Sequence, residues 1–291
     1  MSITRQMKSV AFAISALVAG SANAGIINQW TVGVDAVFLP GSIVATDGAP
    51  GSVAISNGDR TLRWGDSTGY GQSGLDITNS PVNTVVTTGV GVSLPPVANI
   101  SVTHTNQPIT GDSLDKVTLR STLTLTPFDP PLGGLPSTSL DFLIDFFETP
   151  NGDNPCANGG AHGVGVNANG CGDIFVIGTS ALNFPFYYDT DGAGGDDPQQ
   201  YFISFVETSS GLNALSDAAC YAATGSHNPC LGFVTPEKAN TTFQFGSLIT
   251  TERVVIVPPD PDPNDVPEPG VLGLLGLGLA ALGGMRRRRK S

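Results

Sequence analysis

One acidic segment of the chain has the composition of a cation-binding loop. Asp189-Thr190-Asp191-Gly192 is followed by Asp196, and Asn151-Gly152-Asp153-Asn154 is a weaker form of the same pattern. Calcium prefers carboxylate oxygens, and a glycine provides the sharp bend that gathers them. No helical pattern flanks the segment and its twelfth position is not acidic, so it is not an EF-hand loop. We expect a calcium site at Asp189, Asp191 and Asp196 or, more simply, a solvated acidic turn.

The motif Thr103-His104-Thr105-Asn106, followed by Pro108 and Ile109, contains one of the three histidines. An imidazole can act as a general base or as a metal ligand. A metal site needs further ligands, and only His162 and His227 can add imidazoles. Asn106 and Pro108 favour a turn, while the Thr103 and His104 side chains can hydrogen-bond the loop backbone. The motif predicts a structural corner at the end of a strand, with a binding site or a catalytic site as alternatives.

Catalysis of glycoside hydrolysis would require two carboxylates that face each other across a cleft. Asp141, Asp145 and Glu148 lie close together in the sequence, and the first two share one face of a predicted strand. Such spacing arises easily by chance in an acidic chain. The sequence also lacks the signatures of serine hydrolases, phosphate-binding loops, zinc proteases and catalytic cysteines. We therefore expect no enzyme, and no cofactor other than calcium.

The chain has four cysteines, an even number that predicts disulfides in an exported protein. Of the three pairings that four cysteines allow, the spacing favours Cys156–Cys171 and Cys220–Cys230. Each pair brackets a stretch rich in glycine, asparagine and alanine. Such a loop has few core-forming residues and loses less entropy on ordering when it is clipped at its base.

Short strands must position these residues, because helical signals are nearly absent. The chain has 37 glycines and 22 prolines, and only 13% of its residues are charged. The clearest strand is 117–126, where apolar and polar residues alternate with a period of two. Further strands are predicted at 30–37, 53–56, 61–64, 84–88, 99–104, 140–147, 173–177, 184–188, 201–207, 242–245 and 253–257.

About a dozen strands in roughly 245 residues predict an all-β fold, a β-sandwich or a jelly-roll-like arrangement. We expect one domain over residues 25–257, because no linker-like change in composition precedes Pro258. Two β domains divided near residues 93–96 are the alternative.

Both ends of the chain carry export signals. Residues 1–24 have a basic start, a short apolar stretch and Ala22-Asn23-Ala24, which is typical of a cleaved signal peptide. At the other end, a Pro/Asp-rich spacer (258–265) leads to Pro267-Glu268-Pro269, an apolar run and five basic residues. The apolar run, 270–285, would reach roughly 24 Å as a helix, against a hydrocarbon core of about 30 Å. It predicts a marginal, temporary membrane span.

The mature chain is strongly acidic. Residues 25–269 contain six basic and all 25 acidic residues, a formal charge of −19, whereas the whole chain carries −12. Nucleic acid is excluded as a partner, because neutralising phosphates requires a basic surface. Divalent cations, neutral glycans and basic partners remain compatible, and high solubility is the simplest consequence.

The order of Pro267-Glu268-Pro269, a short apolar segment and a basic cluster resembles the PEP-CTERM sorting domain. The resemblance covers residues 266–291. It implies transient insertion of this segment into the inner membrane, where an exosortase, a membrane cysteine protease, would cut near Pro267-Glu268-Pro269. It further implies release to the cell surface or extracellular matrix of a Gram-negative host that makes exopolysaccharide.

The middle of the chain resembles the THxN family of PEP-CTERM proteins. The similar residues are Thr103, His104, Asn106, Pro108 and Ile109, then Phe147-Glu148-Thr149-Pro150-Asn151, Cys156, Cys171-Gly172-Asp173-Ile174-Phe175 and, more loosely, Trp64-Gly65 and 71–75. This resemblance implies no established biochemical activity.

Together these features predict an exported surface or matrix protein, sorted by an exosortase, that acts structurally together with exopolysaccharide. A carbohydrate-binding or calcium-stabilised adhesin is the first alternative. A polysaccharide-active enzyme is the second.

Overall fold

The computed structural model describes residues 25–254, apart from residues 49, 92–93, 179–182, 191–197 and 210. The predicted signal peptide, the spacer, the sorting segment and its apolar run therefore lie outside the described residues. Within the described part, no helix is long and apolar enough to cross a membrane.

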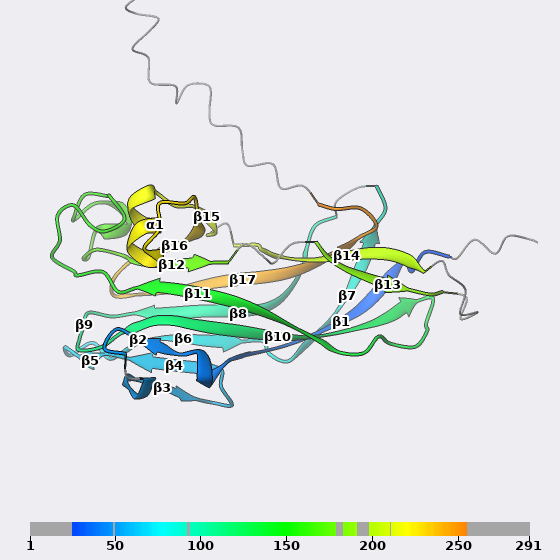
Figure 1. Cartoon of the computed structure of the whole chain (residues 1–291), viewed down its shortest axis with the longest axis horizontal. Helices are drawn as coiled ribbons and strands as arrows, with labels where there is room; N and C mark the ends of the chain where they lie inside the picture. Colours follow the sequence, from blue (N-terminus) through cyan, green and yellow to red (C-terminus); the bar gives the residue numbers. More distant parts are fainter. Residues whose placement is uncertain are drawn as a thin grey trace, which may run out of the picture. The chain divides into compact units, whose positions relative to one another are not determined.

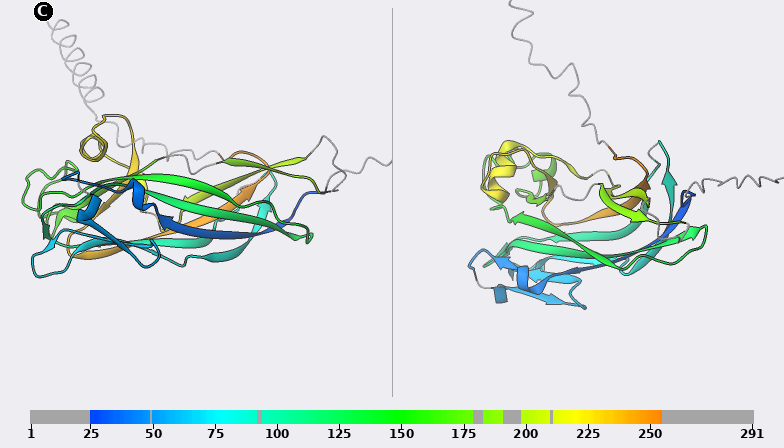
Figure 2. Two further views of the ribbon diagram at one scale, coloured as in Figure 1. Left: turned by 60° about the horizontal axis from the view of Figure 1, so that its bottom comes forward. Right: turned by 45° about the vertical axis from the view of Figure 1, so that its right-hand side comes forward.

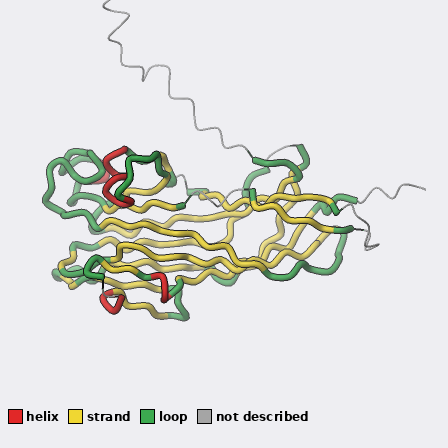
Figure 3. Tube along the Cα trace, in the orientation of Figure 1, coloured by secondary structure: helices red, strands yellow, loops and turns green. Residues whose placement is uncertain are grey.

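The described residues are mostly β-strand, so the all-β prediction is confirmed (Figure 3). The strands are β1 (Gln29–Phe38), β2 (Val44–Ala45), β3 (Val53–Ser56), β4 (Thr61–Trp64), β5 (Asp66–Ser67), β6 (Ser73–Thr78), β7 (Val82–Gly89), β8 (Val97–Asn106), β9 (Ile109–Thr110), β10 (Leu114–Asp129), β11 (Thr138–Phe147), β12 (Asp173–Ile177), β13 (Phe184–Tyr188), β14 (Gln199–Glu207), β15 (Asn213–Ala214), β16 (Leu231–Thr235) and β17 (Ala239–Thr250). The helical segments are α1 (Asp217–Thr224) and three 3-10 turns, η1 (Pro40–Ser42), η2 (Pro50–Ser52) and η3 (Gly165–Asn167).

The long strands lie in two layers (Figures 1 and 2). The first layer has the order β15-β16-β12-β11-β10-β1-β7, and the second contains β14-β17-β8-β6-β4-β3 with β13 beside β14. Neighbouring strands are antiparallel, except where β7 pairs in parallel with β17 through Thr88 and Ile249. This pairing links the two layers at one edge. β7 and β8, which flank residues 93–96, thus belong to one continuous sheet.

The alternation predicted for 117–126 is present in β10, which is longer than expected. The side chains of Val117, Leu119, Leu123 and Leu125 are buried, as is Ser121 on the same face, and the alternate side chains are more exposed. The buried apolar side chains pack with buried side chains of both layers in one core. Its largest members include Trp30 and Trp64, both fully buried. Burial of one strand face against the other layer stabilises this arrangement.

Helix α1 was not expected from the sequence, although its ends carry recognisable signals. Ser216 is the N-cap, and its side chain accepts a hydrogen bond from the Ala219 backbone. Gly225 ends the helix with a left-handed φ of 69°. Serine at the N-cap and glycine after the last turn are the preferred residues there. The short length of the helix hid this signal among the turn-forming residues around it.

The strand predicted at 253–257 is wrong at its described residues. β17 ends at Thr250, and Arg253 and Val254 follow it without strand structure. The amide side chain of Asn183 bonds both backbone groups of Val254, at 2.7 and 2.9 Å. These bonds take the place that a neighbouring strand would fill.

Candidate functional site

Three carboxylic side chains meet between the two layers, at one end of the described part. Glu148 directly follows β11, Asp173 begins β12, and Glu237 lies in the turn from β16 to β17. One carboxylate oxygen from each lies within 4.8 Å of those of the other two. Asp173 and Glu237 are fully buried, and Glu148 is partly exposed. We call these three residues the carboxyl cluster.

The carboxyl cluster has fewer hydrogen bonds than its oxygens require. The Trp64 indole donates to Glu148 Oε2 at 3.2 Å, and the Thr149 backbone N–H donates to Asp173 Oδ1 at 2.9 Å. Among the described residues, Asp173 Oδ2 and both Glu237 oxygens are buried without a hydrogen-bond partner. Buried polar atoms are nearly always paired, because leaving one unpaired is costly.

Two asparagines lie beside Glu237. Asn106 ends β8 and is fully buried; its Nδ2 donates to the Thr235 carbonyl at 3.1 Å. Asn151 follows Glu148 in the next turn, and the Oδ1 atoms of both asparagines are buried without a hydrogen-bond partner in the described part of the chain. Both amides are close enough to Glu237 to lower its pKa. The site therefore contains two asparagine amides, each with a buried unpaired Oδ1, as well as the carboxylates.

Gly170 lets the chain pass close to this site. Its φ is +134°, and a Cβ at this position would lie 2.4 Å from Asn151 Oδ1 and 3.0 Å from Glu237 Cγ. A side chain here would be strained and would collide with two members of the site. The glycine thus keeps Asn151 and Glu237 next to each other.

Burial disfavours the charged form of all three carboxyl groups. It raises the pKa of Glu148 to about 8, against the hydrogen bond from Trp64. It raises the pKa of Glu237 to about 7, against the nearby Asn151 amide, the Lys238 charge and the Asn106 amide. The pKa of Asp173 is raised well above its ordinary range by burial and by the negative charge of Glu148. These groups therefore need either protons or a positive charge at neutral pH.

His104 forms part of the wall of this region and not of its ligand set. The ring is fully buried, with Phe175 at 4.6 Å and Trp64 at 5.9 Å between ring centres. Burial lowers its pKa to about 3, so the ring is neutral. The Thr235 hydroxyl donates to the Asp173 carbonyl at 3.3 Å, and it lies 2.9 Å from His104 Nδ1. Since that hydroxyl has one proton, Nδ1 is the donor to Thr235.

The other residues of the predicted motif have separate partners. Thr103 Oγ1 lies 2.8 Å from Thr242 Oγ1 on β17, and the Pro108 carbonyl accepts from Thr68 at 2.6 Å. Ile109 packs directly against the backbone of Gly65. A Cβ added to this glycine would lie 2.2 Å from Ile109 Cδ1. Of this motif, Asn106 is the residue that reaches the carboxyl cluster.

The two remaining histidines are exposed, and their rings have hydrogen-bond partners of their own. His162 Nε2 lies 3.1 Å from the Asn151 carbonyl, and His227 forms an ion pair with Asp217 at 2.9 Å. The structure does not bring them together with His104. A three-imidazole metal site is therefore not formed.

The carboxyl groups considered for glycoside hydrolysis separate in space. Asp145 pairs with Lys116 at 2.7 Å, and Asp141 forms two bonds of 2.7 Å with Arg120. These cross-strand pairs lie on the outer face of β10 and β11, whereas Glu148 turns to the carboxyl cluster. The acidic loop at Asp189 stays a prediction, since Asp191 and Asp196 lie outside the described residues.

Both predicted disulfides are confirmed. Cys156 is bonded to Cys171 and Cys220 to Cys230. Cys171 stands between Gly170 and Asp173, so the first disulfide closes the loop that connects Asn151 to Asp173. It holds together the two segments that supply three of the site's side chains.

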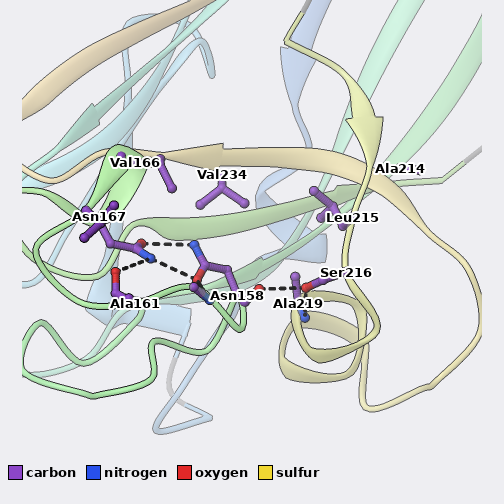
Figure 4. A pocket seen from close by; sticks show the side chains of 12 residues that line it. Asn158, Ala161, Val166, Asn167, Ala214, Leu215, Ser216, Ala219 and Val234 are labelled. Atoms are coloured by element: carbon purple, nitrogen blue, oxygen red, sulfur yellow. Dashed lines mark hydrogen bonds between the residues drawn. The ribbon is translucent and has the colours of Figure 1, made fainter. Parts of the chain in front are cut away.

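A pocket of about 400 Å³ lies between this disulfide loop and α1 (Figure 4). Asn158 and Asn167 bond each other across its wall at 3.0 and 3.1 Å, and Ser216 donates to the Asn158 carbonyl at 2.7 Å. The other lining residues include Val166, Leu215 and Val234. The lining contains no titratable side chain, so this pocket offers no acid–base chemistry.

Comparison with known families places the sorting segment. Residues 265–289 match the model of the PEP-CTERM protein-sorting motif. The chain therefore carries a PEP-CTERM protein-sorting motif. The motif contains the predicted Pro267, Glu268 and Pro269 and indicates an exported protein that an exosortase processes and that reaches the cell surface. A comparison with curated proteins found no significant match.

The sequence analysis missed Asp173 and Glu237 as site residues and considered Glu148 only beside Asp141 and Asp145, a spacing that it attributed to chance. Asn151 had been noted in a weak cation pattern, and Asp173 stood in a recognised block without a role. An acidic residue directly before the apolar run Ile174-Phe175-Val176-Ile177 was the available signal for a buried carboxylate. Glu237 carried no such signal.

Proposed function

We propose that this PEP-CTERM protein is a non-enzymatic structural component of the cell surface or extracellular matrix, held in an exopolysaccharide layer. One observation supports a structural role above the others. The carboxyl cluster, which is the strongest concentration of chemistry in the described part, is packed between the layers beneath Trp64 and Phe146. A glycosidase instead presents its two carboxylates in a cleft that a sugar chain can enter.

We also propose how the protein reaches that place. The signal peptide at 1–24 directs export, and the apolar run at 270–285 then lodges briefly in the inner membrane with its basic end in the cytoplasm. The exosortase cuts near Pro267-Glu268-Pro269 and releases a domain of formal charge −19. The resemblance of residues 103–109 and the later blocks to the THxN family supports the same assignment.

Sorting is tested by changing Glu268→Ala together with Pro267→Ala in the full chain. We expect the variant to stay in the membrane fraction with its uncut mass, and the unchanged chain to appear at the surface with a lower mass. Deleting the exosortase should give the same result as the double substitution. Normal release of the variant would contradict cleavage at this motif.

The structural role is tested on the protein released from cells. We expect it to release no reducing sugar from the host's exopolysaccharide during prolonged incubation, and its deletion to weaken the cohesion of the matrix. Turnover that follows the protein through purification would overturn the non-enzymatic assignment. Binding to a glycan array without turnover would favour the carbohydrate-binding alternative.

A further inference from the structure

We propose that Glu148, Asp173 and Glu237, with the side-chain oxygens of Asn106 and Asn151, form a buried calcium site that joins the two layers of the fold. This site is separate from the acidic loop at Asp189. It goes beyond the proposed matrix role, and neither proposal depends on the other.

The donor set fits calcium by its chemistry. Three carboxylates lie within 4.8 Å of one another, and two amides flank Glu237. Calcium takes six to eight oxygen ligands from carboxylates, amides, carbonyls and water, whereas zinc prefers thiolates and imidazoles. All four cysteines are held in disulfides, and the neutral ring of His104 is packed among aromatic side chains. The oxygens present therefore favour a hard cation.

The second argument comes from atoms that the fold leaves unpaired. Asn106 is fully buried, and its Nδ2 is fixed on the Thr235 carbonyl, yet its Oδ1 has no hydrogen-bond partner among the described residues. The same holds for Asp173 Oδ2 and for both oxygens of Glu237. A protonated carboxyl has one O–H donor, so each bound proton can serve only one of these acceptors. A cation satisfies the carboxylates and the amides together.

The third argument is the net charge of the site. Three carboxylates against one Ca²⁺ leave a single negative charge, and the only basic residue that affects the pKa of Glu237 is Lys238. The Lys238 ammonium lies 4.7 Å from the centre of the exposed Tyr70 ring, at the surface beside the turn. One divalent ion and one lysine thus balance the three carboxylates, which no other basic side chain pairs within the described part.

The position of the site gives the ion a structural task. Asn106 ends β8 in the second layer, while Glu148 directly follows β11 and Asp173 begins β12 in the first. Glu237 lies in the turn that carries the chain from β16 in one layer to β17 in the other. An ion bound to all of them would hold four segments that are far apart in the sequence. Extracellular calcium modules with this task bind at about 10⁻⁴–10⁻³ M.

The first test is calcium-dependent stability of the full chain, purified with both disulfides formed and freed of metal with EDTA. At a hundred-fold excess over the dissociation constant, calcium should raise the melting temperature by about 5–10 °C. Magnesium should give a smaller shift, because it dehydrates reluctantly and rarely takes an all-protein ligand set. Titration calorimetry should give one site, with a dissociation constant of about 10⁻³ M or below. Absence of any calcium binding at 10 mM would overturn the proposal.

Glu237→Gln keeps the side-chain shape and removes one carboxylate. We expect it to abolish the calcium-induced shift while the metal-free variant melts at or above the temperature of the metal-free parent, since one buried charge is gone. Asp141→Asn, which changes a surface ion pair, is the matched control and should keep the full shift. A Glu237→Gln protein that keeps the full shift would contradict the site.

Terbium luminescence tests where in the protein the ion binds. Tb³⁺ shares the oxygen preference of calcium, and its luminescence is sensitised by a nearby indole. Trp64 bonds Glu148 directly, whereas Trp30 packs against Phe186 and Tyr201 on other strands. Trp64→Phe should remove most of the sensitised emission, and Trp30→Phe should leave it. Emission that instead disappears in Asp189→Asn with Asp191→Asn would place the ion in the acidic loop and overturn this assignment.

Discussion

At the scale of single residues, burial decides what each ionisable group does. Glu148, Asp173 and Glu237 are ordinary acids by type, yet burial raises the pKa of Glu148 to about 8 and that of Glu237 to about 7, and it raises the pKa of Asp173 well above its ordinary range. Asp141 stands on the exposed face of β11, where Arg120 lowers its pKa. The pKa values of these groups differ because the groups differ in their exposure to water and in the side chains that lie beside them.

His104 should make the protein sensitive to acid. Its pKa is about 3 when folded and near 6.5 when unfolded, so the unfolded chain binds one more proton between these values. The histidine's contribution to stability is therefore intact above about pH 6.5 and falls as the pH drops toward 3, by at most about 1.4 kcal/mol per pH unit.

This prediction is measured by comparing the parent with His104→Gln in EDTA. The Gln variant should be less stable than the parent at pH 7, because it loses the packing of the His104 ring against its aromatic neighbours. This difference in stability should shrink as the pH falls from 6.5 to 4. The carboxyl cluster titrates in both proteins and cancels from the difference. A constant difference over this range would show that His104 does not titrate on unfolding.

At the scale of elements, the disulfide loops and the ends of strands assemble the site. The end of β8, the end of β11, the start of β12 and the β16–β17 turn lie at the same end of the fold (Figure 1), and each carries or adjoins a polar residue of the site. Cys156–Cys171 closes the loop between Asn151 and Asp173, while Cys220–Cys230 closes the loop after α1. In the sequence, Cys156 and Cys171 thus lie nearer to residues of the site than Cys220 and Cys230 do.

Removing the Cys156–Cys171 disulfide should weaken calcium binding more than removing Cys220–Cys230. A disulfide over a loop of this length stabilises by about 2–4 kcal/mol, so the control pair Cys220→Ser with Cys230→Ser also lowers the melting temperature. Only Cys156→Ser with Cys171→Ser should move the calcium midpoint, by about ten-fold or more. Equal midpoints in the two variants would show that the loop does not organise the site.

At the scale of the whole molecule, side chains of both layers share one main core, and Ile174, Val176, Ala219 and Ala223 form a smaller cluster with α1. Trp30 packs edge-on to Phe186, Tyr188 and Tyr201, and Trp64 packs against His104 and Phe146. Both indoles belong to the same cluster of buried side chains. The layers that connect them are joined through β7 and β17.

We expect the calcium-loaded protein to unfold in a single step. Trp30→Phe leaves Trp64 as the fluorescent reporter, and Trp64→Phe leaves Trp30. In each variant the fluorescence midpoint should coincide with the far-ultraviolet circular dichroism midpoint, because one core loses its packing at once. Midpoints that differ within a variant would reveal two cooperative units, the arrangement that a boundary near residues 93–96 implies.

Much of the fold followed from local patterns. A period of two predicted β10 near its centre, and loop composition predicted both disulfides, since these depend on neighbours in the sequence. Val254 escaped prediction because its backbone bonds the distant Asn183 side chain. Glu148 was considered together with Asp141 and Asp145 because the three residues are neighbours in the chain.

The sequence alone determined the route of this protein, because a sorting signal is read as a linear segment by the export machinery. Residues 265–289 carry that signal whatever the rest of the chain does. Only the tertiary structure decided the site. Asn106 and Glu237 are 131 positions apart in the sequence, yet they meet with Glu148 and Asp173 between the two layers. Their chemistry depends on burial and proximity, which exist only after the layers have packed.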